Sequence, residues 1–361
     1  MTDKTKDKLV NLGKSVLTQM VKKENPSLEI PLRTLSNTVF DEKEGILKIG
    51  NATQKRYFLN LAHSKKFIQT MIIAQKCKEL IEEGKTTSIR DLYYMTKHTI
   101  GESKENTFEE QNESDDVIED LEVSIDSLRE ELNLFASNRG AMVGNVIIND
   151  SGDTIDCGKL GSGGWSIPSI VEEDTIKFKK IDADFVLMVE KDAVWRRLNE
   201  DKFWKKHNCI LIHGQGMAPR GARRLLWRLN KEHKLPVYVF VDNDPWGFYI
   251  YSVIKQGSIN LAYESKRMAV PSARFLGLSS FDQEKYNLPK NVTIKLNKTD
   301  ISRANQILKY DWFQKASWQK EIKHMLQKGV KLELEALSAK GISFVTENYL
   351  PEKMKNKEWL E

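Results

Sequence analysis

Three acidic residues in the second half of the chain have the types and the spacing of a metal site. Glu190 closes the apolar run 184–190, and Asp242 and Asp244 lie at the end of the apolar run 237–244. One acid at the end of a strand is commonly a helix N-cap. Two acids at positions i and i+2, with a third acid at the end of another strand, instead favour a site for a divalent cation. Carboxylates that leave coordination positions open for water suit Mg²⁺.

A second pair of residues has the chemistry of a nucleophile and its neighbour. Arg90 and Tyr94 are four residues apart in a segment of helical periodicity, so they share one helix face. A tyrosine hydroxyl, with a pKa of about 10, is a poor nucleophile at neutral pH without help. A nearby guanidinium can stabilise a phenolate or a phosphate oxygen. Taken alone, the Tyr93–Tyr94 pair is better explained by core packing.

Residues 220–234 place a basic stripe beside an apolar stripe on one expected helix. The pattern fits either a solvated helix face or contact with DNA phosphates. The DNA contacts are expected from Arg220, Arg223 and Arg224. The basic residues of this segment are Arg220, Arg223, Arg224, Arg228, Lys231 and Lys234.

Several other chemistries are not supported by the sequence. The chain contains no GxxxxGK[ST] segment, and no GxGxxG follows an expected strand, so the chain is not expected to hydrolyse ATP itself. There is no HExxH, and the three cysteines are far apart and form no CxxC pair. These observations leave the carboxylate site and the tyrosine as the strongest candidates for chemistry.

The composition is that of a core-forming chain without a membrane span. A length of 361 residues suggests about two or three domains, and the formal charge of +5 permits a nucleic-acid partner without requiring one. No apolar run approaches the ~18–20 residues of a membrane helix. The first twenty residues have interspersed lysines and no apolar core segment, so a secretory signal is not expected. The acidic stretch 109–131 is interpreted as a solvated helix face.

The first half of the chain predicts helices and short strands. Residues 1–25 are expected to form an amphipathic helix, either docked on the chain's own body or serving as an arm for a partner, and residues 26–60 are expected to form short strands. A helix over 64–83, ended by Gly84, precedes a second helix that begins near Ser88. Residues 138–148 resemble a glycine-punctuated turn and strand of a winged helix.

The second half alternates strands and helices. Apolar runs at 184–190, 209–214, 237–244 and 272–278 are separated by helical segments, which predicts a parallel sheet covered on both faces. The carboxyl ends of parallel strands meet at one edge, so the three acids should converge there. The loop-like segment 158–169 is the expected domain boundary, and residues 300–337 are expected to be helical.

These motifs together resemble one family. They occur in the order seen in the A-subunit family of the type IIB topoisomerases, which also contains the eukaryotic meiotic double-strand-break transesterase. The resemblance runs from about residue 60 to the end of the chain, where KLELEALSAKG (331–341) is similar to the closing segment of the family. The matching segments are RDLYYM (90–95), NRGAMVG (138–144), VEKDAVWRRL (189–198), GQGMAPRGARRLLWRL (214–229) and VDNDPWGFYIY (241–251).

The resemblance implies an α/β multidomain fold. A winged-helix domain of the catabolite-activator type is followed by an α/β Toprim domain with a mainly parallel sheet. The implied domains are an N-terminal arm with short strands at 1–60, the winged-helix domain at 61–155, and the Toprim domain with a C-terminal helical part at 156–361.

The resemblance also assigns roles to the candidate residues. Tyr94 would be the nucleophile and Arg90 its catalytic neighbour, while Glu190, Asp242 and Asp244 would hold Mg²⁺. The chain departs from the family at two positions. The family often has a lysine and a tyrosine where this chain has Gln215 and Met217, so no catalytic role is assigned to these two residues.

The implied activity is DNA cleavage by a type IIB topoisomerase, an isomerase. Tyrosine attack on a phosphodiester would give a 5′-phosphotyrosyl enzyme, and two copies in a homodimer would break both strands of double-stranded DNA. Each active site would combine the tyrosine of one protomer with the metal-binding acids of the other. ATP would act only through a separate B subunit, in an A2B2 heterotetramer. The location would be cytoplasmic and nucleoid-associated in an archaeon, or nuclear in a eukaryote.

Three alternatives remain open from the sequence. A recombination-initiating transesterase of the same family would leave the breaks unsealed. A non-catalytic DNA-binding module would carry vestigial acids. A different Toprim enzyme, a primase or a nuclease, would use the acids while the tyrosine serves only packing.

Overall fold

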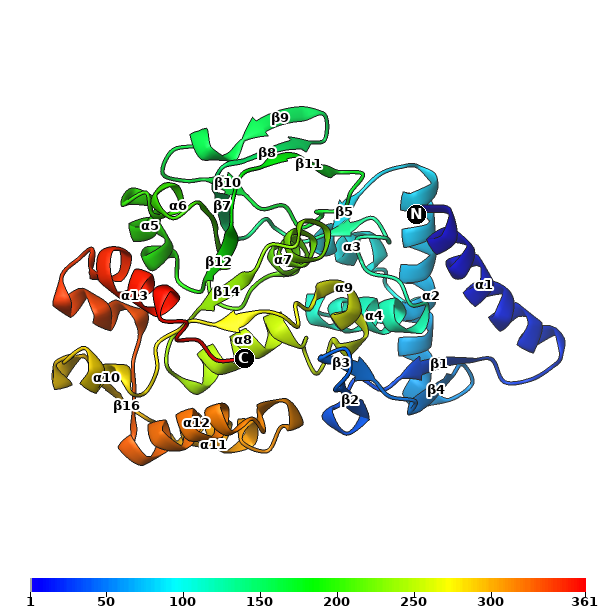
Figure 1. Cartoon of the computed structure of the whole chain (residues 1–361). Coiled ribbons are helices and arrows are strands. Elements are labelled where there is room, and N and C mark those ends of the chain that lie inside the picture. The colour runs from blue at the N-terminus through cyan, green and yellow to red at the C-terminus, as the bar shows by residue number, and fades with distance from the viewer. Residues whose placement is uncertain (1) are drawn as a thin grey trace. The chain divides into compact units, whose positions relative to one another are not determined.

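The computed structural model describes residues 2–361, which divide into two compact units (Figure 1). Unit 1 consists of the chain up to Val39 together with Lys48–Ser137 and Ile259–Tyr263, and unit 2 consists of Phe40–Leu47, Asn138–Ser258 and Glu264–Glu361. The first folded domain was expected to end at residue 155. The chain instead leaves unit 1 after Ser137.

Unit 1 is mainly helical. Its elements are α1 (Thr2–Val21), β1 (Ser27–Pro31), β4 (Thr53–Tyr57), α2 (Leu61–Glu82), β5 (Thr87–Ser88), α3 (Ile89–Thr96), α4 (Gln111–Ser124) and β6 (Leu134–Phe135). The strands β2 (Thr38–Asp41) and β3 (Ile46–Ile49) pair where the chain passes between the units. Short strands were expected at 26–60, and four are present.

The N-terminal helix α1 packs on α2 through part of its apolar face. Leu9 and Val16 are buried in the core of unit 1. Leu17 and Met20, which share the expected apolar face, are 59% and 53% exposed. The helix therefore docks on the chain's own body and still presents apolar side chains to solvent.

The α2–α3 connection has the short turn that the sequence predicts. Gly84 follows the last residue of α2 after one intervening residue, and the Ser88 side chain caps α3 by accepting a hydrogen bond of 3.0 Å from the Asp91 N–H. The cap satisfies one of the free N–H groups at the start of the helix. It fixes the point from which α3 presents Arg90 and Tyr94.

The acidic helix α4 was expected to be a solvated face, but two of its acids are buried. Asp120 is 6% exposed and Glu122 is fully buried. Arg33 and Arg56 pair with Asp120, and Arg129 Nη2 lies 3.0 Å from Glu122 Oε2. Buried carboxylates need such partners because leaving them unpaired in the interior is costly. The acids of this stretch therefore help to hold unit 1 together.

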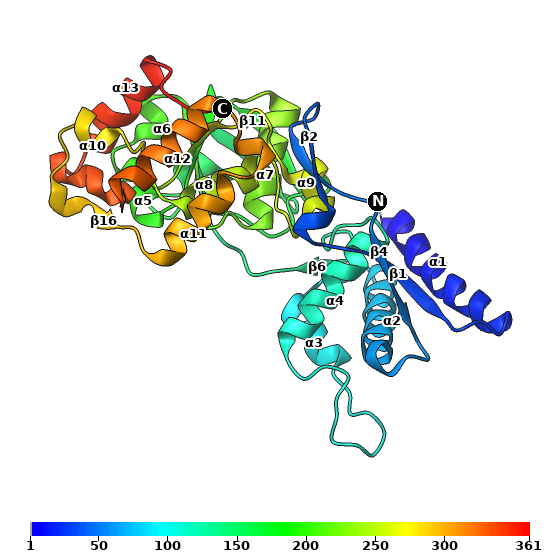
Figure 2. The same ribbon diagram turned by 90° about the horizontal axis from the view of Figure 1, so that it is seen from below.

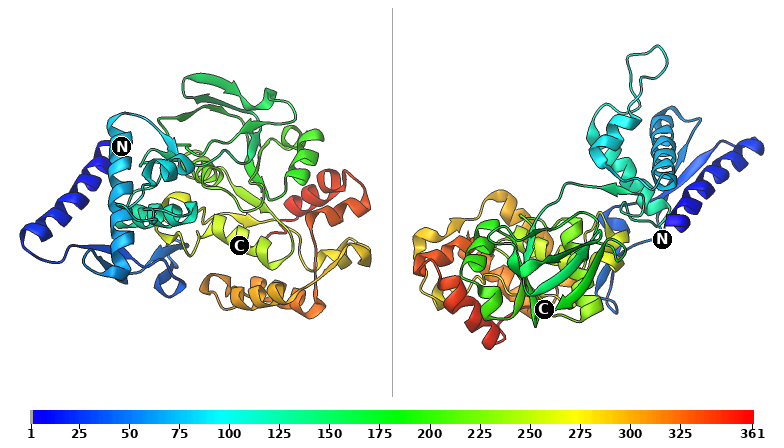
Figure 3. Two further views of the ribbon diagram at one scale, coloured as in Figure 1. Left: turned by 180° about the vertical axis from the view of Figure 1, so that it is seen from behind. Right: turned by 90° about the horizontal axis from the view of Figure 1, so that it is seen from above.

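The segment between α3 and α4 forms a hairpin that extends away from the helices (Figure 2). Thr99 and Asn106 form a β-bridge, and the Thr107 N–H donates to the His98 carbonyl at 2.8 Å. The right-hand view of Figure 3 shows the same hairpin reaching out beyond α2 and α4 of unit 1. It is part of the polypeptide that follows Tyr94.

Unit 2 is built on a six-stranded sheet with the strand order β10-β7-β13-β12-β14-β15. Four adjacent strands, β13, β12, β14 and β15, are parallel, as the sequence predicts. The sheet strands are β7 (Ala141–Val143), β10 (Trp165–Ser166), β12 (Phe185–Val189), β13 (Cys209–His213), β14 (Val237–Phe240) and β15 (Arg274–Phe275).

Helices cover both faces of this sheet. The chain runs from β12 outward to β13 and then back past β12 to β14. Right-handed crossovers therefore place the helices of the two connections on opposite faces. Alternate β12 residues Phe185, Leu187 and Val189 pack with Trp195 in one core cluster. The connecting helices are α5 (Asp192–Glu200), α6 (Phe203–Lys206), α7 (Arg220–His233) and α8 (Pro245–Lys255).

Residues 138–155, which were expected to complete a winged helix, belong to unit 2. Strand β7 pairs antiparallel with β13, with Val143 opposite Leu211. The following strands β8 (Val146–Asp150) and β9 (Asp153–Asp156) form a three-stranded sheet with β11 (Ile176–Ile181). The segment 158–169 is likewise no boundary, because it contributes β10 to the main sheet.

The C-terminal part of unit 2 was expected to be helical over 300–337. This segment contains two α-helices, of which the second ends at Lys328, and a 3₁₀ helix at Leu334–Lys340. Gly329 has a φ of +67°, a left-handed conformation that glycine adopts without strain, and after it Leu332 forms a β-bridge with Asn243 at the carboxyl edge of the sheet. Figure 2 shows α11 and α12 next to each other. The remaining elements are α9 (Ser265–Met268), α10 (Asp282–Lys285), β16 (Ile294–Lys295), α11 (Lys298–Ile307), α12 (Ala316–Lys328), β17 (Val330–Lys331) and α13 (Leu350–Lys355).

All three cysteines are buried free thiols. Burial raises the pKa of Cys77 and of Cys157 to about 12 and also raises the pKa of Cys209. Within residues 2–361, no helix is both long enough and apolar enough to cross a membrane.

Candidate active site

The three candidate metal acids lie at the carboxyl edge of the parallel sheet of unit 2. Glu190 directly follows β12, and Asp242 and Asp244 follow the neighbouring strand β14. The chain leaves β12 toward β13 on one side, and later enters β14 on the other side. The acids therefore lie where the strand order reverses, which is where open α/β sheets bind ligands.

Glu190 is held against the aspartate loop, residues 241–244. Its Oε2 accepts a hydrogen bond of 3.1 Å from the Asp242 backbone N–H, and its own N–H donates to the Phe240 carbonyl at 3.0 Å. Burial raises the pKa of Glu190 to about 7, and the nearby Asp242 charge contributes to the rise. A carboxyl with this pKa is stabilised as an anion when a cation binds next to it.

Asp242 is deeply buried, with 5% of its surface exposed. Its Oδ1 accepts a hydrogen bond of 2.7 Å from the Leu334 backbone N–H, and its Oδ2 lies 3.0 Å from Lys191 Nζ. Burial raises the pKa of Asp242 to about 6 despite these two partners. Both oxygens of this acid are thus oriented by contacts within the chain.

Asp244 has two roles. Its Oδ1 caps α8 by accepting from the Gly247 N–H at 2.6 Å, and its Oδ2 lies 3.8 Å from Lys331 Nζ. Burial raises the pKa of its carboxyl. A Cβ at Gly247 would lie 2.4 Å from the Asp242 carbonyl oxygen, so only glycine allows the helix start to approach the loop this closely. A helix N-cap is therefore one role of Asp244, and its second oxygen faces a lysine at longer range.

Asn243, between the two aspartates, anchors the loop to the body of unit 2. It is 1% exposed, and its Nδ2 donates to the Leu278 carbonyl at 3.1 Å and to Glu321 Oε1 at 2.9 Å. Glu321 is also buried, and its Oε2 accepts from the Ser279 hydroxyl at 2.7 Å. A buried carboxylate satisfied by neutral donors is a costly arrangement that fixes the loop in one conformation.

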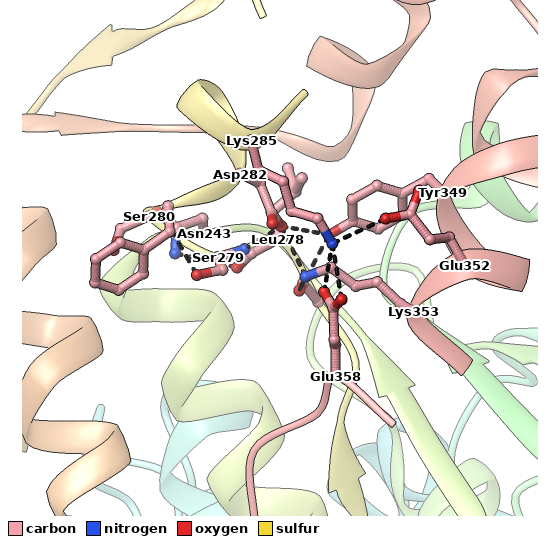
Figure 4. A network of polar contacts seen from close by, with 12 residues as sticks. Asn243, Leu278, Ser279, Ser280, Asp282, Lys285, Tyr349, Glu352, Lys353 and Glu358 are labelled. Atoms are coloured by element: carbon pink, nitrogen blue, oxygen red, sulfur yellow. Dashed lines mark hydrogen bonds and ion pairs between the residues drawn. The ribbon is translucent and has the colours of Figure 1, made fainter. Parts of the chain in front are cut away.

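The turn that contacts Asn243 is itself held by a second network of buried polar contacts around Asp282, drawn in Figure 4. Asp282 Oδ2 accepts from the Ser279 N–H at 2.8 Å, from Lys353 Nζ at 2.8 Å and from the Tyr349 hydroxyl at 2.6 Å. These contacts tie the turn that holds Asn243 to the C-terminal helix. No sequence signal identifies this network, because its members are far apart in the chain.

The donor chemistry of the acids fits Mg²⁺. Three carboxylates meet at adjacent strand ends, and the charges of Asp242 and Asp244 contribute to the raised pKa of Glu190. A hard divalent cation would offset this repulsion. No three Asp, Glu, His or Cys side chains in the described chain are already arranged as a metal-binding group. The hydrogen bond from Leu334 and the Lys191 ion pair direct the oxygens of Asp242 toward other partners.

The loop that follows β13 lies against Glu190. The Gly216 N–H donates to the Glu190 carbonyl oxygen at 3.0 Å, and Gln215 has a left-handed backbone with a φ of 55°. Gln215 and Met217 are exposed. The two positions at which the chain departs from the family pattern therefore border the acid cluster.

In unit 1, the two adjacent tyrosines differ sharply. Tyr93 is 8% exposed, donates its hydroxyl proton to the Glu109 carbonyl at 2.8 Å and accepts from Lys97 Nζ at 2.9 Å. Tyr94 is 60% exposed. Arg90, one turn earlier on α3, is exposed as well. Core packing is thus the role of Tyr93, and Tyr94 is the hydroxyl that α3 presents to solvent.

The arginines of α7 do not form the exposed basic stripe that the sequence suggests. Arg220 and Arg223 both pair with the fully buried Glu264, and Arg224 Nη2 lies 2.6 Å from Glu172 Oε2. Arg223 itself is 4% exposed. Helical periodicity shows that these arginines share a helix face, but it does not show which groups they contact. In the structure their guanidinium groups pair with acids of the same unit.

Comparisons with known proteins match three segments of the chain to models of one group of enzymes. Residues 185–354 match the model of the Toprim domain common to Spo11 and the topoisomerase 6 A subunit, and residues 65–134 match the model described as "Type IIB DNA topoisomerase". Residues 138–182 match the "All-beta domain in DNA topoisomerase VI alpha subunit". Unit 2 thus contains a Toprim domain, a kind of domain that generally binds Mg²⁺.

Similar proteins cover nearly the whole chain. The A subunit of type 2 DNA topoisomerase 6 from Pyrococcus abyssi is 45% identical over 96% of this chain and 93% of its own length. The protein of the same name from Hyperthermus butylicus is 45% identical over 96% and 94%, and that from Methanocaldococcus jannaschii is 36% identical over 98% and 96%. The chain belongs to the A-subunit family of DNA topoisomerase VI.

Proposed function

We propose that the chain is the catalytic, DNA-cleaving subunit of a type IIB DNA topoisomerase, an enzyme of the isomerase class. The observation that carries the proposal is the contrast between Tyr93, whose hydroxyl is bound inside unit 1, and Tyr94, which is exposed on the same helix as Arg90. A nucleophile for DNA must be reachable, and α3 presents one tyrosine in this way. The acid cluster of unit 2 supplies the second half of the chemistry.

The proposed reaction is a transesterification. The Tyr94 oxygen attacks a backbone phosphorus of double-stranded DNA, the bond from phosphorus to the 3′ oxygen breaks, and the tyrosine proton leaves as the phosphotyrosine forms. The products are a 5′-phosphotyrosyl enzyme and a free 3′-hydroxyl, which takes up a proton. Because the phosphodiester energy is conserved in the new ester, attack by the 3′-hydroxyl reverses the step.

The chain's own residues would assist at stated atoms. The Arg90 guanidinium, on the same face of α3 as Tyr94, would offset charge on the phosphate oxygens as the new bond forms. Glu190, Asp242 and Asp244 would hold Mg²⁺, which when bound supplies a Lewis acid for phosphate oxygens. The hydrogen bond from Leu334 and the anchor at Asn243 would keep these carboxylates at the sheet edge.

The assembly follows from the number of nucleophiles. One tyrosine cuts one strand, so a double-strand break requires two copies of the chain. We propose a homodimer in which the tyrosine of one protomer works with the acids of the other, and in which unit 1 has the winged-helix fold that binds DNA. The absence of a P-loop from the sequence supports an ATP-binding B subunit, in an A2B2 complex. A cytoplasmic, nucleoid-associated location would fit the archaeal relatives.

The test is a plasmid assay with the chain and its B subunit. Supercoiled DNA, Mg²⁺ and ATP should give relaxed DNA, and a denaturant added during the reaction should trap broken DNA with protein on both 5′ ends. A trapped adduct without relaxation would instead indicate a recombination-initiating enzyme. Nicking without an adduct would indicate a different Toprim enzyme, and the absence of cleavage would indicate a binding module.

A further inference from the structure

We propose that Lys191, Glu333 and Glu335 are positioning residues that set the divalent-cation affinity of the acid cluster, because the two glutamates share the lysine that would otherwise neutralise Asp242. The inference rests on the proposed function of Glu190, Asp242 and Asp244 as metal ligands. It assigns a role to the segment 331–335, here named the C-terminal strap, which contributes none of those three ligands.

The C-terminal strap contacts each of the last three residues of the aspartate loop. The N–H groups of Asn243 and Leu332 each donate to the other residue's carbonyl, at 2.9 and 3.1 Å. The Leu334 N–H binds Asp242 Oδ1 at 2.7 Å, and Lys331 Nζ lies 3.8 Å from Asp244 Oδ2. The loop is thus held in register by a strap that lies far later in the chain.

Lys191 lies between the aspartate loop and the strap. Its Nζ is 3.0 Å from Asp242 Oδ2, 3.1 Å from Glu333 Oε2 and 2.6 Å from Glu335 Oε2. The side chain of Asp242 is 8% exposed, whereas those of Glu333 and Glu335 are each 47% exposed. One ammonium is therefore shared by a buried acid and two acids at the surface.

This sharing has a direct electrostatic consequence. An ammonium paired with Asp242 alone would compete with a divalent cation for the same carboxylate, because two positive charges at that distance repel. The glutamates offer the ammonium other anchors while it stays attached to the strap. They thereby leave Asp242 with negative charge for a cation. Partners one step removed from the ligands commonly change metal affinity about 10–100-fold.

The experiment measures Mn²⁺ binding to the full chain by the electron paramagnetic resonance signal of free Mn²⁺, at about 0.15 M salt to screen distant charges. The double variant Glu333→Gln/Glu335→Gln should bind Mn²⁺ about tenfold more weakly than the wild type. Lys191→Met should bind at least as tightly as the wild type. The triple variant should match Lys191→Met, because the glutamates act through the lysine.

A matched control exists in the same unit. Lys285 Nζ is held by Glu352 Oε1 at 3.0 Å and Glu358 Oε2 at 2.6 Å (Figure 4). Within residues 2–361, Lys285 makes no ion pair with Glu190, Asp242 or Asp244. The variant Glu352→Gln/Glu358→Gln removes the same two charges from a similar arrangement. It should leave Mn²⁺ affinity within about twofold of the wild type.

Two results would overturn the inference. If the glutamine pair weakens Mn²⁺ binding equally with lysine present and in the Lys191→Met background, the glutamates act as ligands or through the general field. If Lys191→Met weakens binding as much as the glutamine pair does, the contacts are only structural. Thermal unfolding of each variant, with Lys191→Gln as a second lysine variant, identifies any loss that comes from misfolding.

Asp242→Ala separates this inference from the proposed function. If Asp242→Ala binds Mn²⁺ like the wild type, the metal site itself is wrongly assigned. If Asp242→Ala loses binding while the glutamine pair does not, the metal site stands and only the role of Lys191 and the strap fails.

Discussion

The helix that carries Tyr94 exposes its side chain to solvent, whereas the loop that carries Asp242 buries its side chain. Tyr94 is 60% exposed on an eight-residue helix, whereas Asp242 is 5% exposed and is oriented by Lys191 and by the backbone of Leu334. In the proposed reaction, the tyrosine must reach a phosphorus on another molecule. The acids that we propose as metal ligands must keep a fixed geometry before that molecule arrives.

The difference shows which region carries the larger folding cost. Exposed groups contribute little to folding, so α3 can present Tyr94 and Arg90 at small cost. The acid cluster keeps charges in the interior, and that cost is offset by the sheet, the Asn243 anchor and the strap. Substitutions at the tyrosine should therefore remove activity without affecting stability, and substitutions around the acids should affect both.

The largest effect is expected at Tyr94. Tyr94→Phe removes the oxygen that we propose as the nucleophile, so denaturant-trapped DNA adducts should fall by more than about a thousandfold with an unchanged thermal midpoint. Tyr93→Phe is the control. It loses the hydrogen bond to Glu109 and should destabilise the chain by about 1 kcal/mol while still forming the adduct. The opposite pattern would show that the exposed tyrosine is not the nucleophile.

A smaller but still large effect is expected at Asp242. Asp242→Ala should reduce Mg²⁺-dependent cleavage about a hundredfold or more, because a charged ligand is lost at the reacting phosphate. Asp153→Ala, which changes an exposed acid of unit 2, should cleave normally. Cleavage by the wild type in excess chelator would refute the metal assignment.

The arginines of α7 provide the next test, because they are cationic side chains held by acids inside unit 2. Arg223→Ala leaves the buried Glu264 with one arginine fewer and should lower the free energy of unfolding by about 3 kcal/mol. Because Arg223 is buried in an ion pair, the slope of DNA affinity against salt should not change. Lys231→Ala, an exposed change on the same helix, should alter stability by less than about 0.5 kcal/mol. A reduced salt slope for Arg223→Ala would instead place this residue on the DNA.

The smallest effect on cleavage is expected at Asn243, for which Asn199 of unit 2 provides a matched control. Asn199 is 2% exposed and holds the carbonyls of Gly161 and Ser162, while Asn243 holds Leu278 and Glu321. Alanine at either position should cost about 1–3 kcal/mol of stability. Asn243→Ala should also reduce cleavage at saturating Mg²⁺ and below the unfolding temperature, whereas Asn199→Ala should not. Equal cleavage by both variants would show that the anchor serves stability alone.

The sheet of unit 2 and the convergence of its acids could be predicted from the sequence. Apolar runs alternating with helices identify parallel strands, and parallel strands bring Glu190 and Asp242 to the same edge. The start of α3 at Ser88 was also predictable, because an N-cap is a local signal. Local periodicity and chain direction were enough for these features.

The partners of the acids could not be predicted in this way. Leu334 binds Asp242 across 92 residues, and Glu321 binds Asn243 across 78. Such contacts follow from the packing of elements that are distant in the chain, and no spacing rule encodes them. The same limit applies to β7, which the sequence places with the first domain but which pairs in unit 2 with β13, far later in the chain. It also explains why arginines that pair with acids of their own unit resembled a DNA-binding stripe.

The burial of every cysteine has a practical consequence for following the reaction. With the pKa of Cys77 and of Cys157 at about 12 and all three thiols inside the fold, thiol reagents should leave the native chain unmodified. Cysteines introduced at the exposed positions Lys104, in the hairpin of unit 1, and Lys340, in unit 2, would then be the reactive sites. A fluorescent dye pair attached there would follow, by energy transfer, the distance between the two units as DNA is cut, passed and rejoined.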